Sequence, residues 1–384
     1  MIWIIAAFFA LALLTHAGGL GVVRLLLAML VVGSHVGGLG ATLAGSVGIC
    51  GFFAISGFLM ARTIAANYSS AGAVRFYMNR FIRLVPPVVA VMGLSVLILF
   101  LRDGEGFRIK STSDTLYMPV GPPASALQWF RLNWRPPPIF VVPSFYTLPQ
   151  AWSLITESCF YLVAPLAAWL LARRGGAFVA LAAAASAVLT ALAVWGGQDV
   201  WLRSPLASFW IFGLGMLTYH WRREQPFAAA AARRLRWLAT AILVVLLLLT
   251  FRFLPVPPVV TVLATPLLML VWLWLVDASD PTAPRWGHEA GNWAYGVFLA
   301  HFLGTLTMYW IAETVYRKTG MFGLFGEPDS SSELRLVISA FLFALLFGIA
   351  VYYVVEKPFE RLRAVIRSSR LIEDRDARLA SPQP

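Results

Sequence analysis

The sequence predicts an all-α, polytopic membrane protein whose helices pack as a bundle. Of its 384 residues, 59% are hydrophobic and only 12% are charged, about half the charged fraction of an ordinary soluble domain. The mean hydropathy is +0.76. Apolar runs of roughly twenty residues recur along the chain, which is the length of a helix that crosses a bilayer. They lack the polar–apolar alternation of a transmembrane β-barrel.

Ten core transmembrane helices follow from the positions of these runs. The predicted spans are 20–40, 43–61, 84–102, 151–172, 177–195, 205–221, 236–254, 258–276, 292–311 and 336–355. Together they define a transmembrane domain over 20–358, which is followed by a basic cytoplasmic tail over 359–384.

A separate hydrophobic segment, 1–19, precedes the core spans. Residues 1–17 are apolar and lack the basic start of a cleaved signal peptide. They predict an extra N-terminal hydrophobic helix, which would place the N-terminus outside. A membrane-buried segment that does not cross, or a start codon assigned too early, are the alternatives.

The basic residues predict the orientation. With both ends of the ten-helix domain inside, 19 of the 30 Lys and Arg residues fall in cytoplasmic segments and 10 fall outside, while Arg24 lies within a span. This bias follows the positive-inside rule and accounts for the net charge of +12 without nucleic acid as a partner. We therefore expect a multi-pass protein of a cell membrane, such as the bacterial inner membrane, with a cytoplasmic C-terminus. The sequence does not predict the oligomeric state.

One long outer loop, 103–150, connects two spans and is rich in proline, tryptophan and tyrosine. Proline stiffens the chain and removes hydrogen-bond donors, so the loop predicts a packed lid of extended segments. Its aromatic side chains suit the C–H faces of sugar rings. Anchoring of these side chains at the membrane interface is the alternative.

The first core span carries two ionisable residues, Arg24 and His35, in the stretch VRLLLAMLVVGSHVG. Eleven helical residues bring them to the same face, about 16 Å apart along the axis. Ionisable groups inside a bilayer are costly, so both are candidate functional residues. A neutral imidazole can deprotonate a hydroxyl; a hydrogen bond between helices is the structural alternative for His35.

Two further arginines, Arg80 and Arg83, lie three residues apart in RFYMNRFIRLVPP. We expect them at the cytoplasmic end of a span that begins after Pro86 and Pro87. Two guanidiniums on one face can clamp phosphates in the bidentate manner of arginine. Binding of lipid head groups is the alternative. The chain has no P-loop, so nucleoside triphosphate hydrolysis has no support.

The stretch AWSLITESCFYLVAPL places a carboxylate, Glu157, inside a span. Ser153 and Tyr161 lie four residues before and after it, so the three form a polar stripe on one helix face. Ser153 as a helix N-cap, and Glu157 as a structural partner for Arg24, are the alternatives.

Weaker signals complete the set. Ser56 and Gly57 lie within a span, where a kink or a tight helix contact is the modest interpretation. His301 lies in a span with Tyr295 upstream, and Glu356 is followed by Pro358, which is expected to stop the last helix. Two cysteines fall in apolar runs and read as small hydrophobic residues rather than as a disulfide or a metal site: Cys50 and Cys159.

In this order the motifs resemble the acyltransferase-3 family of integral membrane acyltransferases, over about 20–362. The residues that carry the resemblance are Arg24 and His35, Ser56-Gly57-Phe58, Arg80 and Arg83 with Pro86, Trp152-Ser153-Leu154 with Glu157 and Phe160-Tyr161, Tyr295 with His301, and Glu356 with Pro358. Proteins of this family move acyl groups, often acetyl, from cytoplasmic acyl-CoA to hydroxyls of exported carbohydrates or lipid-linked glycans.

The resemblance implies roles for these residues. His35 and Glu157 are the expected catalytic residues. The expected site for acyl-CoA, in the first place acetyl-CoA, comprises Arg24, Arg80 and Arg83. Residues expected to contact the substrate or to support the site are Ser153, Trp152, Tyr161, His301 and Ser56. The expected partners are the bilayer and a carbohydrate or glycolipid acceptor, and no metal is implied.

Three mechanistic and functional alternatives stay open at this point. His35 either activates the acceptor hydroxyl for direct attack or carries the acyl group itself. The same intramembrane charges could instead line the path of a transporter or flippase for a lipid-linked sugar, although matched broken helices are absent from the sequence pattern. A non-catalytic membrane scaffold would leave those charges unexplained.

Overall fold

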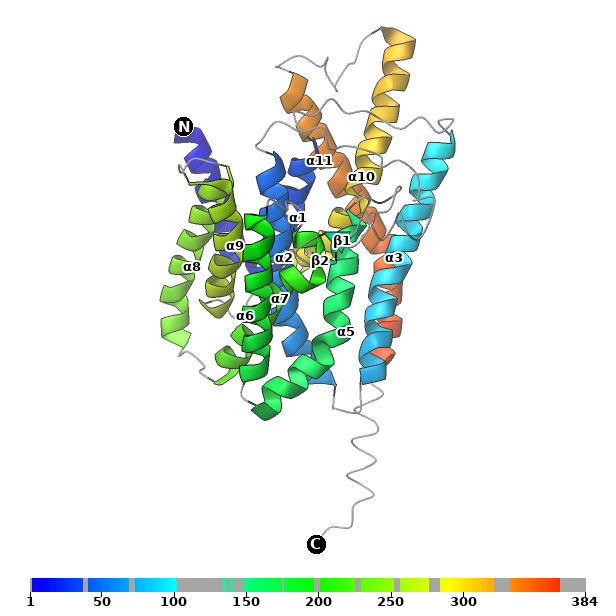
Figure 1. Ribbon diagram of the computed structural model, residues 1–384. Helices are drawn as coiled ribbons and strands as arrows, with labels where there is room; N and C mark the ends of the chain where they lie inside the picture. The colour runs from blue at the N-terminus through cyan, green and yellow to red at the C-terminus, as the bar shows by residue number, and fades with distance from the viewer. Residues whose placement is uncertain are drawn as a thin grey trace.

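The computed structural model describes residues 2–36, 41–68, 73–101, 134–135, 139–140, 148, 150–174, 176–196, 201–224, 229–251, 256–275, 284–320 and 332–366. These residues form an all-α bundle, which confirms the predicted fold class (Figure 1). The helices are α1 (Ile2–Val36), α2 (Ala41–Asn67), α3 (Ala73–Leu101), α5 (Ala151–Arg174), α6 (Ala177–Trp195), α7 (Pro205–Glu224), α8 (Ala229–Thr250), α9 (Pro258–Leu275), α10 (Arg285–Thr319) and α11 (Ser332–Val351), with the 3₁₀ helix η2 (Trp201–Arg203) and the π-helix η4 (Tyr352–Glu356).

Each predicted core span overlaps one of these helices. Among the described residues, seven helices are long and apolar enough to cross a membrane: α1, α2, α3, α5, α6, α10 and α11. The helices α8 and α9 contribute shorter apolar stretches, Trp237–Thr250 and Val259–Leu275. The membrane character of the bundle is therefore clear, while the number of crossings stays a prediction.

The N-terminal segment and the first core span form one element, α1, with a break at Gly19. The backbone there has φ 66° and ψ −154°, a conformation that glycine adopts far more readily than other residues. The break lies at the predicted boundary between the segment 1–19 and the core domain. Residues 2–18 are thus helical, as the extra N-terminal helix requires.

The helix α3 differs from its prediction. The expected span began after Pro86 and Pro87, but α3 begins at Ala73 and contains both prolines. Helices in membranes tolerate proline where neighbouring groups satisfy the freed backbone. In the same turn, the Tyr295 hydroxyl of α10 donates a hydrogen bond to the carbonyl of Leu84 at 3.3 Å.

This early start places two arginines within the helix. Arg80 lies seven residues into α3 and Arg83 ten, within a candidate membrane span that covers Ala73–Ile98. At 1.5 Å per residue, they are about 10 and 15 Å from the beginning of the helix. Arg80 is buried within the bundle, while the position of both arginines at the cytoplasmic membrane border stays a prediction.

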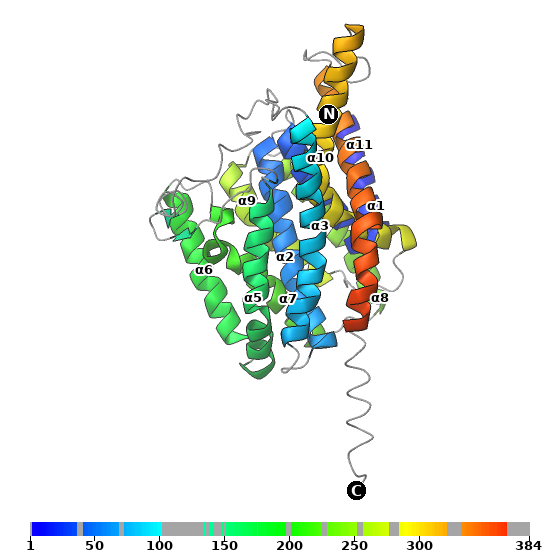
Figure 2. The ribbon, with the colours of Figure 1, turned by 90° about the vertical axis from the view of Figure 1, so that its right-hand side faces the viewer.

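The central helix of the bundle is α2. It contacts α1, α5, α7 and α9, and 78% of its candidate membrane span is buried (Figure 2). Gly57 lets α7 approach closely, because a Cβ atom there would lie 2.0 Å from the carbonyl oxygen of Phe212. The tight helix contact that Ser56-Gly57 predicts is thus confirmed.

The outer loop is described only in part. A two-residue strand β1 (Trp134–Arg135) pairs antiparallel with β2 (Ile139–Phe140), in the register Trp134 to Phe140 and Arg135 to Ile139. The rest of the predicted aromatic lid, and residues 367–384 of the predicted tail, lie outside the described residues. Both cysteines are free thiols, with Cys50 buried and Cys159 half-buried.

The close contact between α2 and α7 predicts the effect of adding one methyl group. Gly57→Ala should lower the unfolding temperature of the purified protein in detergent, because its Cβ meets backbone that cannot move aside. Gly93→Ala is the matched control, since a Cβ at Gly93 meets nothing within 4 Å. The control should match or exceed the wild type, owing to the better helix propensity of alanine. Equal unfolding temperatures for the two variants would contradict the packing described here.

Candidate active site

A cavity of about 260 Å³ lies inside the bundle between α1, α2, α3, α5 and α10. Its polar lining consists of Arg24, Ser56, Thr63, Arg80, Arg83, Ser153, Glu157, Tyr161 and Tyr295. The remaining lining is apolar. Because charged groups are expensive within membrane-spanning helices, their convergence on one cavity marks a functional site.

Glu157 accepts hydrogen bonds from hydroxyl groups on two helices. The Ser56 hydroxyl of α2 donates to its Oε1, and the Tyr161 hydroxyl of α5 donates to the same atom at 2.5 Å. Glu157 and Tyr161 meet because residues four apart share a helix face. Charge-assisted hydrogen bonds of this kind are strong, so the carboxylate is held in one position on the cavity wall.

The guanidinium of Arg80 lies between two aromatic rings. Its central carbon is 5.5 Å from the centre of the Phe76 ring and 5.4 Å from that of Tyr161, distances at which cation–π attraction operates. The side chain is 6% exposed, and its Nε and Nη1 atoms have no hydrogen-bond partner among the described residues. A buried donor without a partner costs about 1–3 kcal/mol, so Arg80 is available to an acceptor from outside the chain.

Arg24 and Arg83 reach the same cavity from α1 and α3, and their like charges repel. Both interact electrostatically with Glu157 and Glu356. Within the described parts of the chain, however, neither forms an ion pair or a hydrogen bond with an acidic side chain. With Arg80, three guanidiniums face two carboxylates. The excess of positive charge favours an anionic ligand.

Glu356 comes from the π-helix η4, which follows α11. The sequence predicted that Pro358 stops this helix, but the chain stays helical through Pro358 to Ile366. A π-turn accommodates the irregularity, and such turns are frequent at functional sites. One carboxylate oxygen of Glu356, Oε1, is buried without a hydrogen-bond partner.

His35 does not line this cavity. Its ring stacks on that of His301, with centroids 5.3 Å apart and an interplanar angle of 19°. His301 is 1% exposed, and its Nδ1 lies 2.6 Å from the carbonyl oxygen of Phe298. Since a carbonyl only accepts, Nδ1 carries the proton and Nε2 keeps a lone pair. That Nε2 atom has no partner among the described residues.

An aromatic wall separates the cavity from the histidine pair. Phe52 and Phe298 line the cavity and touch each other edge to face, with ring centroids 5.7 Å apart. The Phe298 ring is also 6.1 Å from that of His301. The arginines and the histidines are thus neighbouring sites, separated by a layer one aromatic ring thick.

The structure places most of the predicted site residues around this one cavity. Arg24, Ser56, Arg80, Arg83, Ser153, Glu157 and Tyr161 line it. His35 and His301 form the neighbouring pair, so Glu157 contacts Ser56 and Tyr161 and not His35. Trp152 does not line the cavity, and its ring lies 5.9 Å from the guanidinium of Arg203. Ser153 also donates to the carbonyl of Gln150 at 3.0 Å, beside the start of α5.

Sequence reasoning missed the two phenylalanines of the wall. Phe52 and Phe298 are indistinguishable from other apolar residues of their spans, since only their position above the cavity marks them. The sequence analysis also assigned no role to Tyr295 and Glu356, although both belong to the motifs that carry the family resemblance. Among the described residues, no group of three His, Cys, Asp or Glu side chains gathers as a metal site requires.

Comparison with known proteins identifies the domain. The family model Acyl_transf_3, described as an acyltransferase domain, matches residues 18–357. No curated protein and no solved structure matches the chain.

The excess positive charge predicts that a small anion stabilises the fold. Inorganic pyrophosphate should raise the unfolding temperature of the purified protein, because a ligand that binds only the folded state stabilises it by about 2.7 kcal/mol at a hundred times its Kd. Arg83→Gln should remove most of this rise. Arg361→Gln, at an exposed arginine outside the cavity, should keep it. Sodium chloride at equal ionic strength controls for screening. The same rise in both variants would refute the assignment of the anion to the cavity.

Proposed function

The chain belongs to the acyltransferase-3 family and is a membrane acyltransferase; from this premise, we propose that it moves an acyl group from cytoplasmic acyl-CoA to a hydroxyl group on the outer side. Acetyl is the proposed acyl group, and a carbohydrate or lipid-linked glycan is the proposed acceptor. The observation that carries the proposal is the membrane-embedded cavity with three arginines that lack hydrogen-bonded acidic partners in the described chain.

The proposed donor site is the cavity itself. Acyl-CoA carries a diphosphate, and arginine binds phosphate oxygens through two parallel hydrogen bonds more effectively than lysine does. Arg80 and Arg83 would bind the diphosphate, and Arg24 would meet it from α1. Glu157 acts here as a positioning residue, because it holds the hydroxyl of Tyr161, whose ring lies against Arg80. The bound diphosphate would supply the negative charge that the cavity lacks.

The proposed path of the thioester runs along α1. Arg24 and His35 are eleven residues apart on one helix face, about 16 Å, a distance comparable to an extended pantetheine arm. The arm is thin and mostly neutral, which limits the cost of taking it into the membrane. Because Phe298 lines the cavity, touches Phe52 and lies 6.1 Å from the His301 ring, the proposal requires these rings to turn aside when the arm enters.

His35 is the proposed general base. It would take the proton of the acceptor hydroxyl while the oxygen attacks the thioester carbonyl. A carbon–oxygen bond forms, the carbon–sulfur bond breaks, and the proton passes from His35 to the departing CoA thiolate. The stacked ring of His301 supports the imidazole of His35 from one side. In the variant with an acyl-histidine, the same imidazole attacks the thioester first.

Transfer of label tests this function directly. Purified protein in liposomes receives radiolabelled acetyl-CoA on one side and glycan acceptors on the other. The proposal predicts labelled glycan and free CoA in equal amounts. Movement of a lipid-linked sugar without any acyl transfer would instead support the transporter alternative.

Removal of the proposed base should abolish transfer without unfolding the protein. His35→Ala should reduce kcat by at least about a hundredfold, the usual worth of general-base catalysis, while the KM for acetyl-CoA stays near the wild-type value. His288→Ala is the matched control, because His288 is an exposed histidine on α10. Wild-type kcat in the His35 variant would reject its role.

The aromatic wall yields a separate prediction. Phe298→Trp adds bulk where the pantetheine arm must pass, so it should lower kcat about tenfold or more and leave the affinity for CoA unchanged. Phe298→Leu presents a smaller side chain and should retain transfer. If both variants transfer at the wild-type rate with wild-type KM, the proposed path past Phe298 is wrong.

A further inference from the structure

We propose that a second, larger chamber binds the adenine nucleotide of acyl-CoA; this inference rests on the proposed function and extends its donor site. The chamber has a volume of about 830 Å³ and opens between α2, α3, α5 and α7. Pockets of 300–1,000 Å³ are typical of sites for nucleotides and other small molecules, as a rough guide. The cavity of about 260 Å³ cannot hold a whole CoA molecule, so the nucleotide needs a place beside it.

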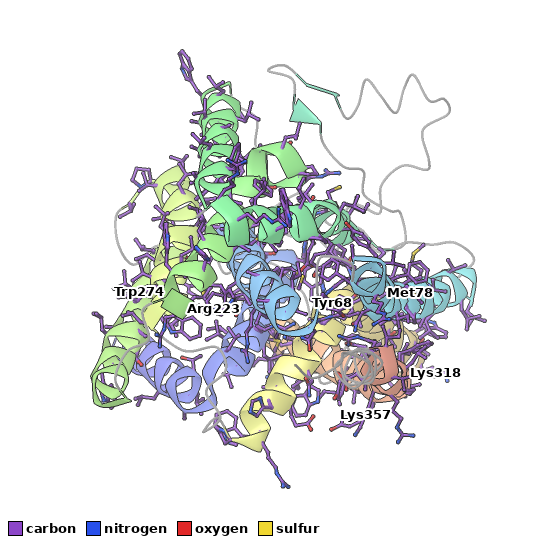
Figure 3. The ribbon with its side chains drawn as sticks, turned by 90° about the horizontal axis from the view of Figure 1, so that it is seen from below. Tyr68, Met78, Arg223, Trp274, Lys318 and Lys357 are labelled. Atoms are coloured by element: carbon purple, nitrogen blue, oxygen red, sulfur yellow. The ribbon has the colours of Figure 1, made fainter. Side chains whose placement is uncertain are left out.

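The residues that line the chamber come from the ends of α2, α5 and α7 and the beginning of α3. These helix ends lie at the lower end of the bundle in Figure 1. Figure 3 looks onto this end and labels Tyr68 and Arg223, which both line the chamber. The excess of basic residues predicts that this end faces the cytoplasm. A cytoplasmic donor would therefore meet the chamber before the cavity.

Three helices line both spaces in succession. On α2, Met60 and Thr63 line the cavity, and the next residue after each of them lines the chamber. On α5, Tyr161 lines the cavity and Pro165, one turn further, lines the chamber. The two linings share no residue, so the chamber lies beside the cavity, displaced toward the lower end of the bundle.

Arg80 marks the junction of the two spaces on α3. Its guanidinium lies in the cavity, 5.5 Å from the ring of Phe76, and Phe76 lines the chamber. A nucleotide in the chamber would place its 5′-diphosphate next to this arginine. The order nucleotide, diphosphate and pantetheine along CoA then matches the order chamber, cavity and aromatic wall.

The chamber has the chemistry of a purine site. Four aromatic side chains line it, namely Tyr68, Phe76, Trp169 and Tyr219. Stacking of a base on an aromatic ring contributes about 1–3 kcal/mol. Arg223 lines the chamber, and Arg173 lies 5.1 Å from the Trp169 ring. The two guanidiniums can bind the ribose 3′-phosphate. A lipid acyl chain in the same space would leave them without an anionic partner.

The test uses adenosine 3′,5′-bisphosphate, the nucleotide part of CoA without its pantetheine arm. It should bind the purified wild-type protein and compete with acetyl-CoA. Ala65→Trp fills the chamber from α2, so it should abolish this binding and raise the KM for acetyl-CoA about tenfold or more. The same variant should use S-acetyl-pantetheine, which lacks the nucleotide, as well as the wild type does. Ala66→Trp is the matched control, because both alanines are exposed but only Ala65 lines the chamber.

Three results would show that the chamber does not bind the nucleotide. If the wild type does not bind adenosine 3′,5′-bisphosphate, or if Ala65→Trp leaves its binding and the KM for acetyl-CoA unchanged, the chamber is not a nucleotide site. Loss of a co-purified phospholipid from Ala65→Trp with an unchanged KM would assign the chamber to lipid and overturn the inference. Nucleotide binding is measured without transfer, so failure of acyl transfer itself counts against the proposed function and not against the chamber.

Discussion

An excess of positive charge inside the membrane is the constraint on which the site depends. A charged arginine at the centre of a bilayer costs about 2.5–3.5 kcal/mol even by insertion scales, and this chain brings three of them to one cavity. Glu157 accepts hydrogen bonds from Ser56 and Tyr161, and Glu356 interacts with Arg24 and Arg83 without a hydrogen bond to either. Three arginines without hydrogen-bonded carboxylates would only destabilise a protein with a purely structural role. They suit a protein that binds a polyanionic substrate within its transmembrane helices.

The remaining features of the site follow one axis through the bundle. From the lower end upward, the wide aromatic chamber is followed by the arginine cavity, the wall of Phe52 and Phe298, and then the stacked histidines. The proposals assign a role to each of these places: the chamber stacks the base, the arginines bind the diphosphate and His35 transfers the proton. In the proposed reaction, the wall would keep water of the arginine cavity away from the thioester.

Much of this arrangement could be predicted from the sequence, because the relevant signals are local. Long apolar runs locate the helices, and helical periodicity places Glu157 and Tyr161 on one face. Other features depend on tertiary context. Pro86 and Pro87 suggested a helix start, but a membrane helix continues where its neighbours satisfy the freed backbone. Periodicity relates Arg24 to His35 along one helix, but it cannot reveal that Phe298 of α10 lies between their two sites.

A structure of the protein with CoA bound tests the central claim most directly. We expect diphosphate oxygens within hydrogen-bond distance of the guanidiniums of Arg80 and Arg83, with the thiol end past the Phe298 ring and next to His35. CoA bound elsewhere on the protein, with the arginine cavity unoccupied, would contradict it.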